Sequence, residues 1–126
     1  MSAQIERRIV MPLLQAMLLG SDHLQFEDVE TIIEALTPFC EQYDEISFGM
    51  SDVRTSQHLE SESVQILTNL VQRNENNWCA KGMLACLYFR MGNRQWKALT
   101  TEILKSTQDV RAHALVKAVL LEAKGV

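Results

Sequence analysis

The sequence predicts an all-α protein built from antiparallel helix pairs, and three observations favour this fold class. Apolar residues recur at three- and four-residue spacing along nearly the whole chain, which is the pattern of amphipathic helices. Among its 126 residues the chain has only 2 prolines and 5 glycines, too few for the many turns of an all-β fold. Several residues also repeat 35 positions apart, a period typical of stacked two-helix units.

Length and composition indicate a single domain over residues 1–126. Hydrophobic residues make up 47% of the chain, which is enough for a core. The net charge is −4 and the basic residues are scattered, which argues against nucleic-acid binding. No apolar run is long enough to span a bilayer, and the run after Arg8 is broken by Pro12 and Gln15, with no small-residue cleavage site after it. We therefore expect a cytoplasmic protein with no membrane span.

The first predicted helix covers residues 3–19 and ends at Gly20-Ser21-Asp22. Pro12 lies inside it and removes one backbone donor. Two interpretations follow: Pro12 kinks one long helix, or residues 1–10 form a frayed arm and the stable helix begins near Pro12, where proline suits the first turn. The inward stripe of this helix is expected to hold Ile5, Ile9, Leu13, Ala16 and Met17.

Three further helices are predicted over 26–36, over 43–54 and from a serine cap to near Gln72. Thr37-Pro38 ends the first of them, because proline restricts the residue before it. The cap of the last is expected to be Ser61 or Ser63, since serine is favoured at this position. The inward residues of the three helices are expected to be Val29, Ile32, Ile33 and Leu36, then Ile46, Met50 and Val53, then Val64, Leu67 and Val71.

The last three helices are predicted over 78–91, 95–105 and 109–124. The helix over 78–91 is apolar on almost every side, which indicates either a central helix or one with a second face for a partner. Gly92 after it is typical of a left-handed cap. Asp109 and Lys124 suit the dipole of the last helix, whose inward residues are expected to be Val110, Leu115, Val119 and Leu120.

The 35-residue period indicates about three two-helix units. It relates Val29, Val64 and Leu99, and it also relates Gln25, Glu60 and Gln95. The third unit is the clearest, because the spacing of its Leu-Ala pair, its tyrosine and its glycine matches the tetratricopeptide consensus: Leu84, Ala85, Tyr88 and Gly92. The sequence thus favours a tetratricopeptide-like right-handed array of antiparallel helix pairs plus a C-terminal helix. An unrelated helical bundle is the alternative, because the other units match weakly.

The sequence has no pattern typical of catalysis or metal binding. None of the histidines has a second histidine or a cysteine one helical turn away: His23, His58 and His113. There is no glycine-rich phosphate loop and no nucleophile-elbow serine. An odd number of cysteines in apolar surroundings argues against a disulfide framework: Cys40, Cys79 and Cys86. We expect no enzymatic activity, no metal and no cofactor.

A set of motifs lies between residues 77 and 120. It comprises Trp78, the stretch from Leu84 to Gly92 with its Ala-Cys pair and Tyr88, the pair Leu99 and Leu104, and Ser106-Thr107-Gln108-Asp109-Val110-Arg111 before the last helix. In these motifs, in length and in its three-unit layout, the chain resembles the small tetratricopeptide-like chaperones that guard the needle subunit of bacterial type III secretion systems. The first half of the chain matches that family only in pattern.

The resemblance implies a cytoplasmic heterotrimer with the needle subunit and a second small helical chaperone. In that family a concave groove holds the amphipathic C-terminal helix of the needle subunit and prevents premature polymerisation. The resemblance and the repeat register imply six partner-binding residues: Cys79, Gly82, Cys86, Phe89, Ala16 and Leu19. Their middle-unit equivalents are polar, namely Ser47, Ser51 and Arg54. Whether the middle unit contributes to the groove therefore stays open.

Other interpretations stay open as well. Cys79, Cys86 and Phe89 form one stripe that suits burial inside the monomer as well as it suits contact with a ligand. A general tetratricopeptide-like scaffold with another peptide partner would have the same exposed groove. A small helical ligand-binding domain would instead have an enclosed pocket with converging polar groups.

Overall fold

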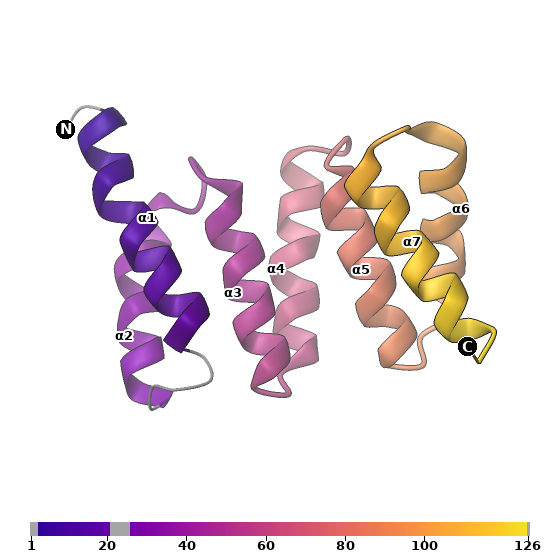
Figure 1. Cartoon of the computed structure of the whole chain (residues 1–126), viewed down its shortest axis with the longest axis horizontal. Coiled ribbons are helices and arrows are strands. Elements are labelled where there is room, and N and C mark those ends of the chain that lie inside the picture. The colour runs from indigo at the N-terminus through magenta and orange to yellow at the C-terminus, as the bar shows by residue number, and fades with distance from the viewer. Residues whose placement is uncertain (1–2, 21–25, 126) are drawn as a thin grey trace. The chain divides into compact units, whose positions relative to one another are not determined.

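The computed structural model describes the backbone of residues 3–20 and 26–125 and the side chains of residues 7–17 and 27–125 (Figure 1). Over these ranges the chain is all-α, which confirms the predicted class. The elements are α1 (Ala3–Gly20), α2 (Phe26–Leu36), the 3-10 helix η1 (Thr37–Phe39), α3 (Asp44–Ser56), α4 (Glu60–Arg73), α5 (Trp78–Arg90), α6 (Gln95–Ser106) and α7 (Val110–Ala123). The helices begin and end at or close to the predicted residues, apart from the start of α4.

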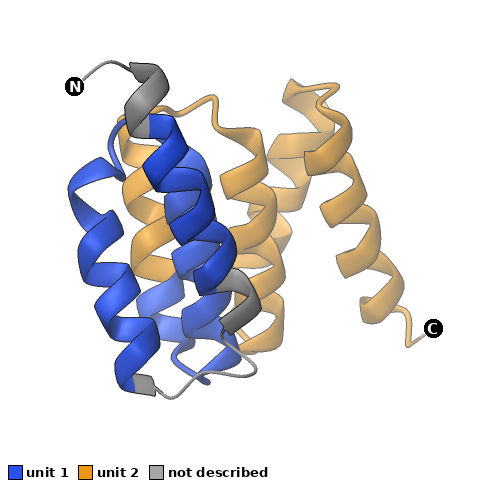
Figure 2. Ribbon diagram, turned by 60° about the vertical axis from the view of Figure 1, so that its left-hand side comes forward, with its two compact units in different colours: residues 1–63 blue, residues 64–126 orange. Residues whose placement is uncertain are grey.

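Contacts divide the chain into two compact units, residues 1–63 and residues 64–126 (Figure 2). In the first unit α1 packs against α2 and α3. The hydrophobic core cluster of this unit is formed by Val10, Leu14, Met17, Val29, Ile33, Leu36, Ile46 and Val53. The predicted inward residues of α2 and α3 are thereby confirmed, with Ile32 and Met50 partly buried at the edge of the core.

The predicted inward stripe of α1 is wrong at Ile9 and Ala16, whereas Met17 is confirmed and Leu13 is partly buried against the core. The structure buries Val10, Leu14 and Met17, whereas Ile9 and Ala16 are exposed. The buried face is thus turned by about one residue, or about 100°, from the predicted one. Ile5 lies outside the residues whose side chains are described.

Pro12 does not interrupt α1, which is continuous from Ala3. Its ring lies on the exposed side of the helix. A missing backbone hydrogen bond is tolerated best on the solvent side of a helix, where water can replace it. Of the two interpretations of this segment, the structure therefore supports one long helix rather than an arm before Pro12.

The predicted serine cap of α4 is wrong, because α4 begins at Glu60 and includes both candidate serines. Ser63 is fully buried, and its Oγ donates to the carbonyl oxygen of Ser51 at 2.7 Å. The Oγ1 of Thr55 lies 2.9 Å from the same hydroxyl. Ser63 thus links the first turn of α4 to α3, a role that a serine near a helix start does not reveal in the sequence.

In the second unit α5 packs against both α6 and α7, and α6 packs against α7 (Figure 1). Ile103, Ala112 and Val116 form a buried cluster, with Trp78 partly buried against it. The predicted cap of α5 is confirmed, because Gly92 has a φ of 72° and the Asn93 amide donates to the Tyr88 carbonyl at 2.8 Å.

The prediction for α7 is wrong at two of its four inward residues. Val110 is 81% exposed and Leu120 is exposed, whereas Val119 is buried and Leu115 is partly buried. The residues buried in α7 are Ala112, Val116 and Val119. Helices α5 and α6 cover only one side of α7. Apolar periodicity cannot tell which apolar residues of such a helix are left uncovered. The position of Asp109 is confirmed, because its carboxylate accepts from the Ala112 amide at 2.9 Å.

Candidate partner-binding surfaces

Two of the predicted partner-binding residues on α5 face α7. A Cβ atom added at Gly82 would lie 2.9 Å from Cδ1 and 3.2 Å from Cβ of Leu115. Glycine at this position therefore lets the two helices approach closely. One turn further on, the Cys86 thiol donates to the carbonyl oxygen of Leu115, with a sulfur–oxygen distance of 3.8 Å. Burial raises the pKa of this thiol, and Glu122 adds to the rise.

Phe89 lies at the other end of the stripe and contacts α6. Its ring meets the ring of Trp96 edge to face, with centroids 5.3 Å apart. The ammonium of Lys97 lies 5.8 Å from the centroid of the same indole. Phe89 is half-buried, so part of its ring stays accessible.

The remaining predicted partner-binding residues are spread over both units. Cys79 is half-buried in the first turn of α5. Ala16 is exposed on α1, in the other unit. Leu19 belongs to α1, but its side chain lies outside the described part of the chain. The structure therefore brings Gly82 and Cys86 together along α7 and places Cys79 and Phe89 on the same helix.

The polar residues of the middle two-helix repeat, all of which lie on α3, are buried or partly buried. Ser47 and Ser51 have almost no exposed surface. Arg54 forms an ion pair with Glu30, in which its Nη2 lies 2.9 Å from a carboxylate oxygen. Its Nε also lies 3.3 Å from Glu62. The hydrogen bond from Arg54 holds the pKa of Glu30 below its ordinary value, against the opposing effect of burial.

A buried lysine joins α5 to α6 in the second unit. The Nζ of Lys81 lies 2.6 Å from a carboxylate oxygen of Glu102 and 4.5 Å from the centroid of the Trp78 ring. Both contacts stabilise the charge of an amine that is almost fully buried. Trp78 therefore acts here as part of the core, in line with its packing against Ile103 and Val116.

An apolar recess of about 400 Å³ lies between α4, α5 and α6. Tyr88 lines it, although the tetratricopeptide register predicts an inter-helix packing position for this residue. Its other lining residues are Thr68, Val71, Gln72, Leu84, Gln95, Ala98 and Leu99. This recess could not be predicted from the sequence, because its residues come from three helices and share no spacing.

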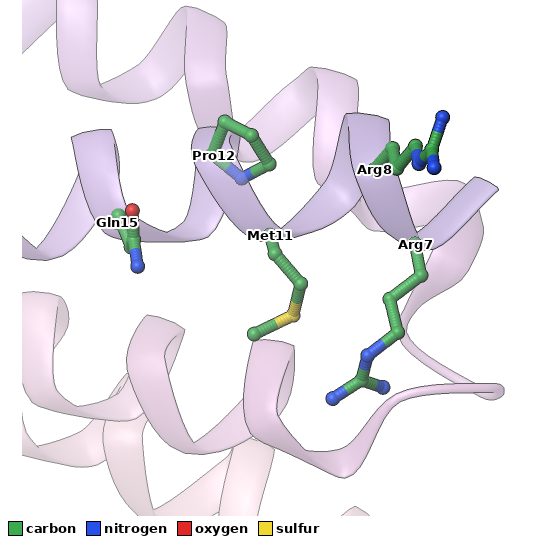
Figure 3. Close-up of a pocket in the computed structure, with 5 residues that line it drawn as sticks. All are labelled: Arg7, Arg8, Met11, Pro12 and Gln15. Atoms are coloured by element: carbon green, nitrogen blue, oxygen red, sulfur yellow. The ribbon is translucent and has the colours of Figure 1, made fainter. Parts of the chain in front are cut away.

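A second recess of about 480 Å³ lies on α1 and is lined by Arg7, Arg8, Met11, Pro12 and Gln15 (Figure 3). The side chains of Arg7 and Met11 point to one side of the helix and that of Arg8 points away from them. The guanidinium of Arg7 lies 5.9 Å from the centroid of the Tyr43 ring. Arg7, one of the two arginines that line this recess, therefore already contacts a residue of its own unit.

The described side chains contain no group of three or more His, Cys, Asp or Glu residues that could hold a metal ion. His113 uses its Nε2 in a 2.6 Å hydrogen bond with the Thr107 carbonyl. None of the helices in the described ranges has the length and apolar character needed to cross a membrane.

The family model of the bacterial type III secretion protein (HrpB1_HrpK) matches residues 1–125. The chain belongs to this family. As a member of the HrpB1_HrpK family it takes part in bacterial type III secretion, which confirms the secretion-system part of the predicted resemblance. Neither a curated protein nor a solved structure matched the chain.

Proposed function

We propose that this HrpB1_HrpK-family protein is a cytoplasmic chaperone of a type III secretion needle subunit. It binds the amphipathic C-terminal helix of that subunit, together with a small helical co-chaperone, and so prevents premature polymerisation. The family match over residues 1–125 carries the secretion part of this proposal. The binding mode is helix-in-groove recognition, in which an apolar stripe folds onto an apolar surface.

Apolar side chains that the fold leaves accessible support a binding role. Phe89 and Cys79 are half-buried on α5, and Val110 and Leu121 are exposed on α7. Accessible apolar residues on neighbouring helices are typical of surfaces that bind other proteins.

The proposal includes a tetratricopeptide-like arrangement of three helix pairs, namely α1–α2, α3–α4 and α5–α6, closed by α7. The 35-residue period supports it. The packing of α5 against both α6 and α7 also supports it, because the first helix of such a unit contacts its own partner helix and the first helix of the next unit. A general scaffold for another peptide would share this arrangement, so the partner decides between the two.

Co-expression with the needle subunit and the co-chaperone of the same secretion system tests the proposal. We expect the three proteins to co-purify as one complex. We also expect the purified chain to suppress the light-scattering increase that accompanies needle polymerisation. Unchanged polymerisation in the presence of excess chain would refute the chaperone role.

Phe89→Glu tests the binding surface. Loss of an aromatic anchor commonly costs about 2 kcal/mol of binding, or about 30-fold in affinity. We expect Phe89→Glu to lose the needle subunit in a pull-down and to keep its helical circular dichroism. Tyr88→Ala should instead lower the melting temperature, because it enlarges the recess between α4, α5 and α6. If Phe89→Glu unfolds the chain and Tyr88→Ala only weakens binding, the proposed register is wrong by one residue.

A further inference from the structure

Helix α7 carries an apolar stripe that no other described helix covers. Val110 is 81% exposed and Leu121 is 44% exposed, and the two alanines between them are exposed as well, Ala114 and Ala118. At about 100° per residue these four side chains lie within about 80° of one another around the helix. We refer to these four residues as the α7 face.

The repeat period relates the α7 face to the part of α5 that packs against α7. Cys79 corresponds to Ala114 and Cys86 corresponds to Leu121, each 35 residues further along the chain. On this side of α5, Gly82 and Cys86 lie against Leu115 of α7. Helix α7 therefore presents to solvent the side on which, by repetition, another helix would pack.

The charges around the α7 face indicate the chemistry of that helix. Lys117 lies at the position equivalent to Gly82, and Lys124 lies two turns further along the same side. Arg111 adds a third cation, whereas Glu122 is the single acidic residue from 110 to 124. Glu122 and Arg111 lie within about 20° of each other around the helix, so the net positive charge beside the α7 face comes from the two lysines. A second copy of α7 would bring like charges together, whereas an acidic helix would neutralise them.

We propose that the α7 face binds the amphipathic helix of the needle subunit, which lies along α7 as α7 lies along α5. Its apolar side chains cover Ala114, Ala118 and Leu121, and its acidic side chains lie beside Lys117 and Lys124. The inference rests on the proposed chaperone function and extends its binding surface from Phe89 on α5 to the α7 face, so that a substitution at either place weakens binding. Because Lys117 replaces the glycine of α5, this helix stays further from α7 than α7 stays from α5.

The test uses the full chain and a fluorescein-labelled peptide of the C-terminal helix of the needle subunit from the same secretion system. Leu121→Glu and Ala114→Glu place a carboxylate on the α7 face, in two different turns. The matched control is Leu104→Glu, since Leu104 is 47% exposed and lies on α6 in the same unit. Fluorescence anisotropy should show at least tenfold weaker binding for both α7 variants and a change within twofold for the control.

A second pair of variants tests the charges. We expect the double variant Lys117→Glu, Lys124→Glu to bind the peptide at least tenfold more weakly, and Lys105→Glu on α6 to bind it as the wild type does. The affinity of the wild type should fall between 50 and 300 mM salt, roughly the range over which exposed charges become screened. Equal binding by the double variant and the wild type would overturn the acidic-helix assignment.

The outcomes separate the two proposals. If the wild type does not bind the peptide, the chaperone function fails and the α7 site fails with it. If it binds and Leu121→Glu binds equally well, only the α7 site is overturned. Equal losses for Leu121→Glu and Leu104→Glu would also overturn it, because the effect would not be local. If light scattering shows that Leu121→Glu converts a dimer into a monomer while peptide affinity is unchanged, a second copy covers the α7 face instead.

Discussion

Helices α3 and α5 use opposite chemistry at positions that the 35-residue period makes equivalent. Ser51 and Arg54 on α3 correspond to Cys86 and Phe89 on α5. On α3 the Ser51 carbonyl accepts from Ser63, and Arg54 forms its ion pair with Glu30. On α5 a thiol and an aromatic ring take the same places, against Leu115 and Trp96.

The comparison shows that a polar stripe is not necessarily a solvated one. Among the described residues, every buried side-chain nitrogen and oxygen atom has a hydrogen-bond partner. The polar groups of the α3 stripe therefore form hydrogen bonds within their own unit, whereas the side chains of the α5 stripe are stabilised by close packing. Hydropathy alone could not show which of the two stripes is available to a partner.

Gly82→Leu should produce the largest effect, because it overpacks the close contact between α5 and α7. Even a Cβ atom at this position would come within 2.9 Å of Leu115, and a leucine adds three more carbons. We expect a loss of about 3 kcal/mol in the free energy of unfolding, at the upper end for overpacked sites. Chemical denaturation followed by tryptophan fluorescence measures it. The exposed Ala118→Leu variant should change stability by less than about 0.5 kcal/mol, and equal losses in the two would contradict close packing at Gly82.

Ser63→Ala tests the hydrogen-bonded side of the comparison and should have a smaller effect. It removes the 2.7 Å bond to the Ser51 carbonyl and the contact with Thr55. Loss of one buried hydrogen bond costs about 1–2 kcal/mol. Denaturation followed by circular dichroism should show this loss. Ser61→Ala, at an exposed position of the same helix, is the control and should leave the midpoint unchanged; a wild-type midpoint for Ser63→Ala would mean that the buried hydroxyl contributes nothing.

Glu30→Gln should have the smallest effect and should depend on pH. The pKa of Glu30 is lowered in the folded chain by its hydrogen bond with Arg54, so its contribution to stability is present above its ordinary pKa of 4.5. That contribution is lost as the pH falls through the folded-state pKa. We expect the variant to be about 1 kcal/mol less stable at pH 7 and to converge with the wild type in acid. Urea midpoints by circular dichroism across this range, with Glu34→Gln as an exposed control, measure the difference; a gap that widens in acid would reverse the assigned sign.

Helix positions could be predicted from the sequence because local chemistry marks their ends. Gly92 takes the left-handed conformation that a helix cap needs, and Asp109 accepts from the first turn of α7. The role of a single polar residue was harder to predict than the position of a helix. Ser63 is a residue type that is favoured at helix caps, yet it is buried, and only its hydrogen bond to Ser51 on α3 reveals this role.

The exposed faces of the outer helices could not be predicted for a related reason. In α1 and α7 apolar residues stand next to one another, such as Ile9 beside Val10 and Val119 beside Leu120. A shift of one residue turns the face by about 100° and leaves the periodicity almost unchanged. The choice is made by which neighbouring helices cover the face, and this depends on distant parts of the chain. Gly82 was predicted as a partner-binding residue, and its close approach to Leu115 of α7 could be found only in the structure.

Both tryptophans of the chain, Trp78 and Trp96, lie in the unit formed by residues 64–126. Indole emission therefore reports the unfolding of this unit alone, whereas far-ultraviolet ellipticity sums the helices of both. In a single cooperative transition the two signals share one midpoint, and in independent transitions they separate. One thermal scan recorded with both detectors thus shows whether the native chain unfolds in one cooperative transition or in more than one, with no label and no substitution.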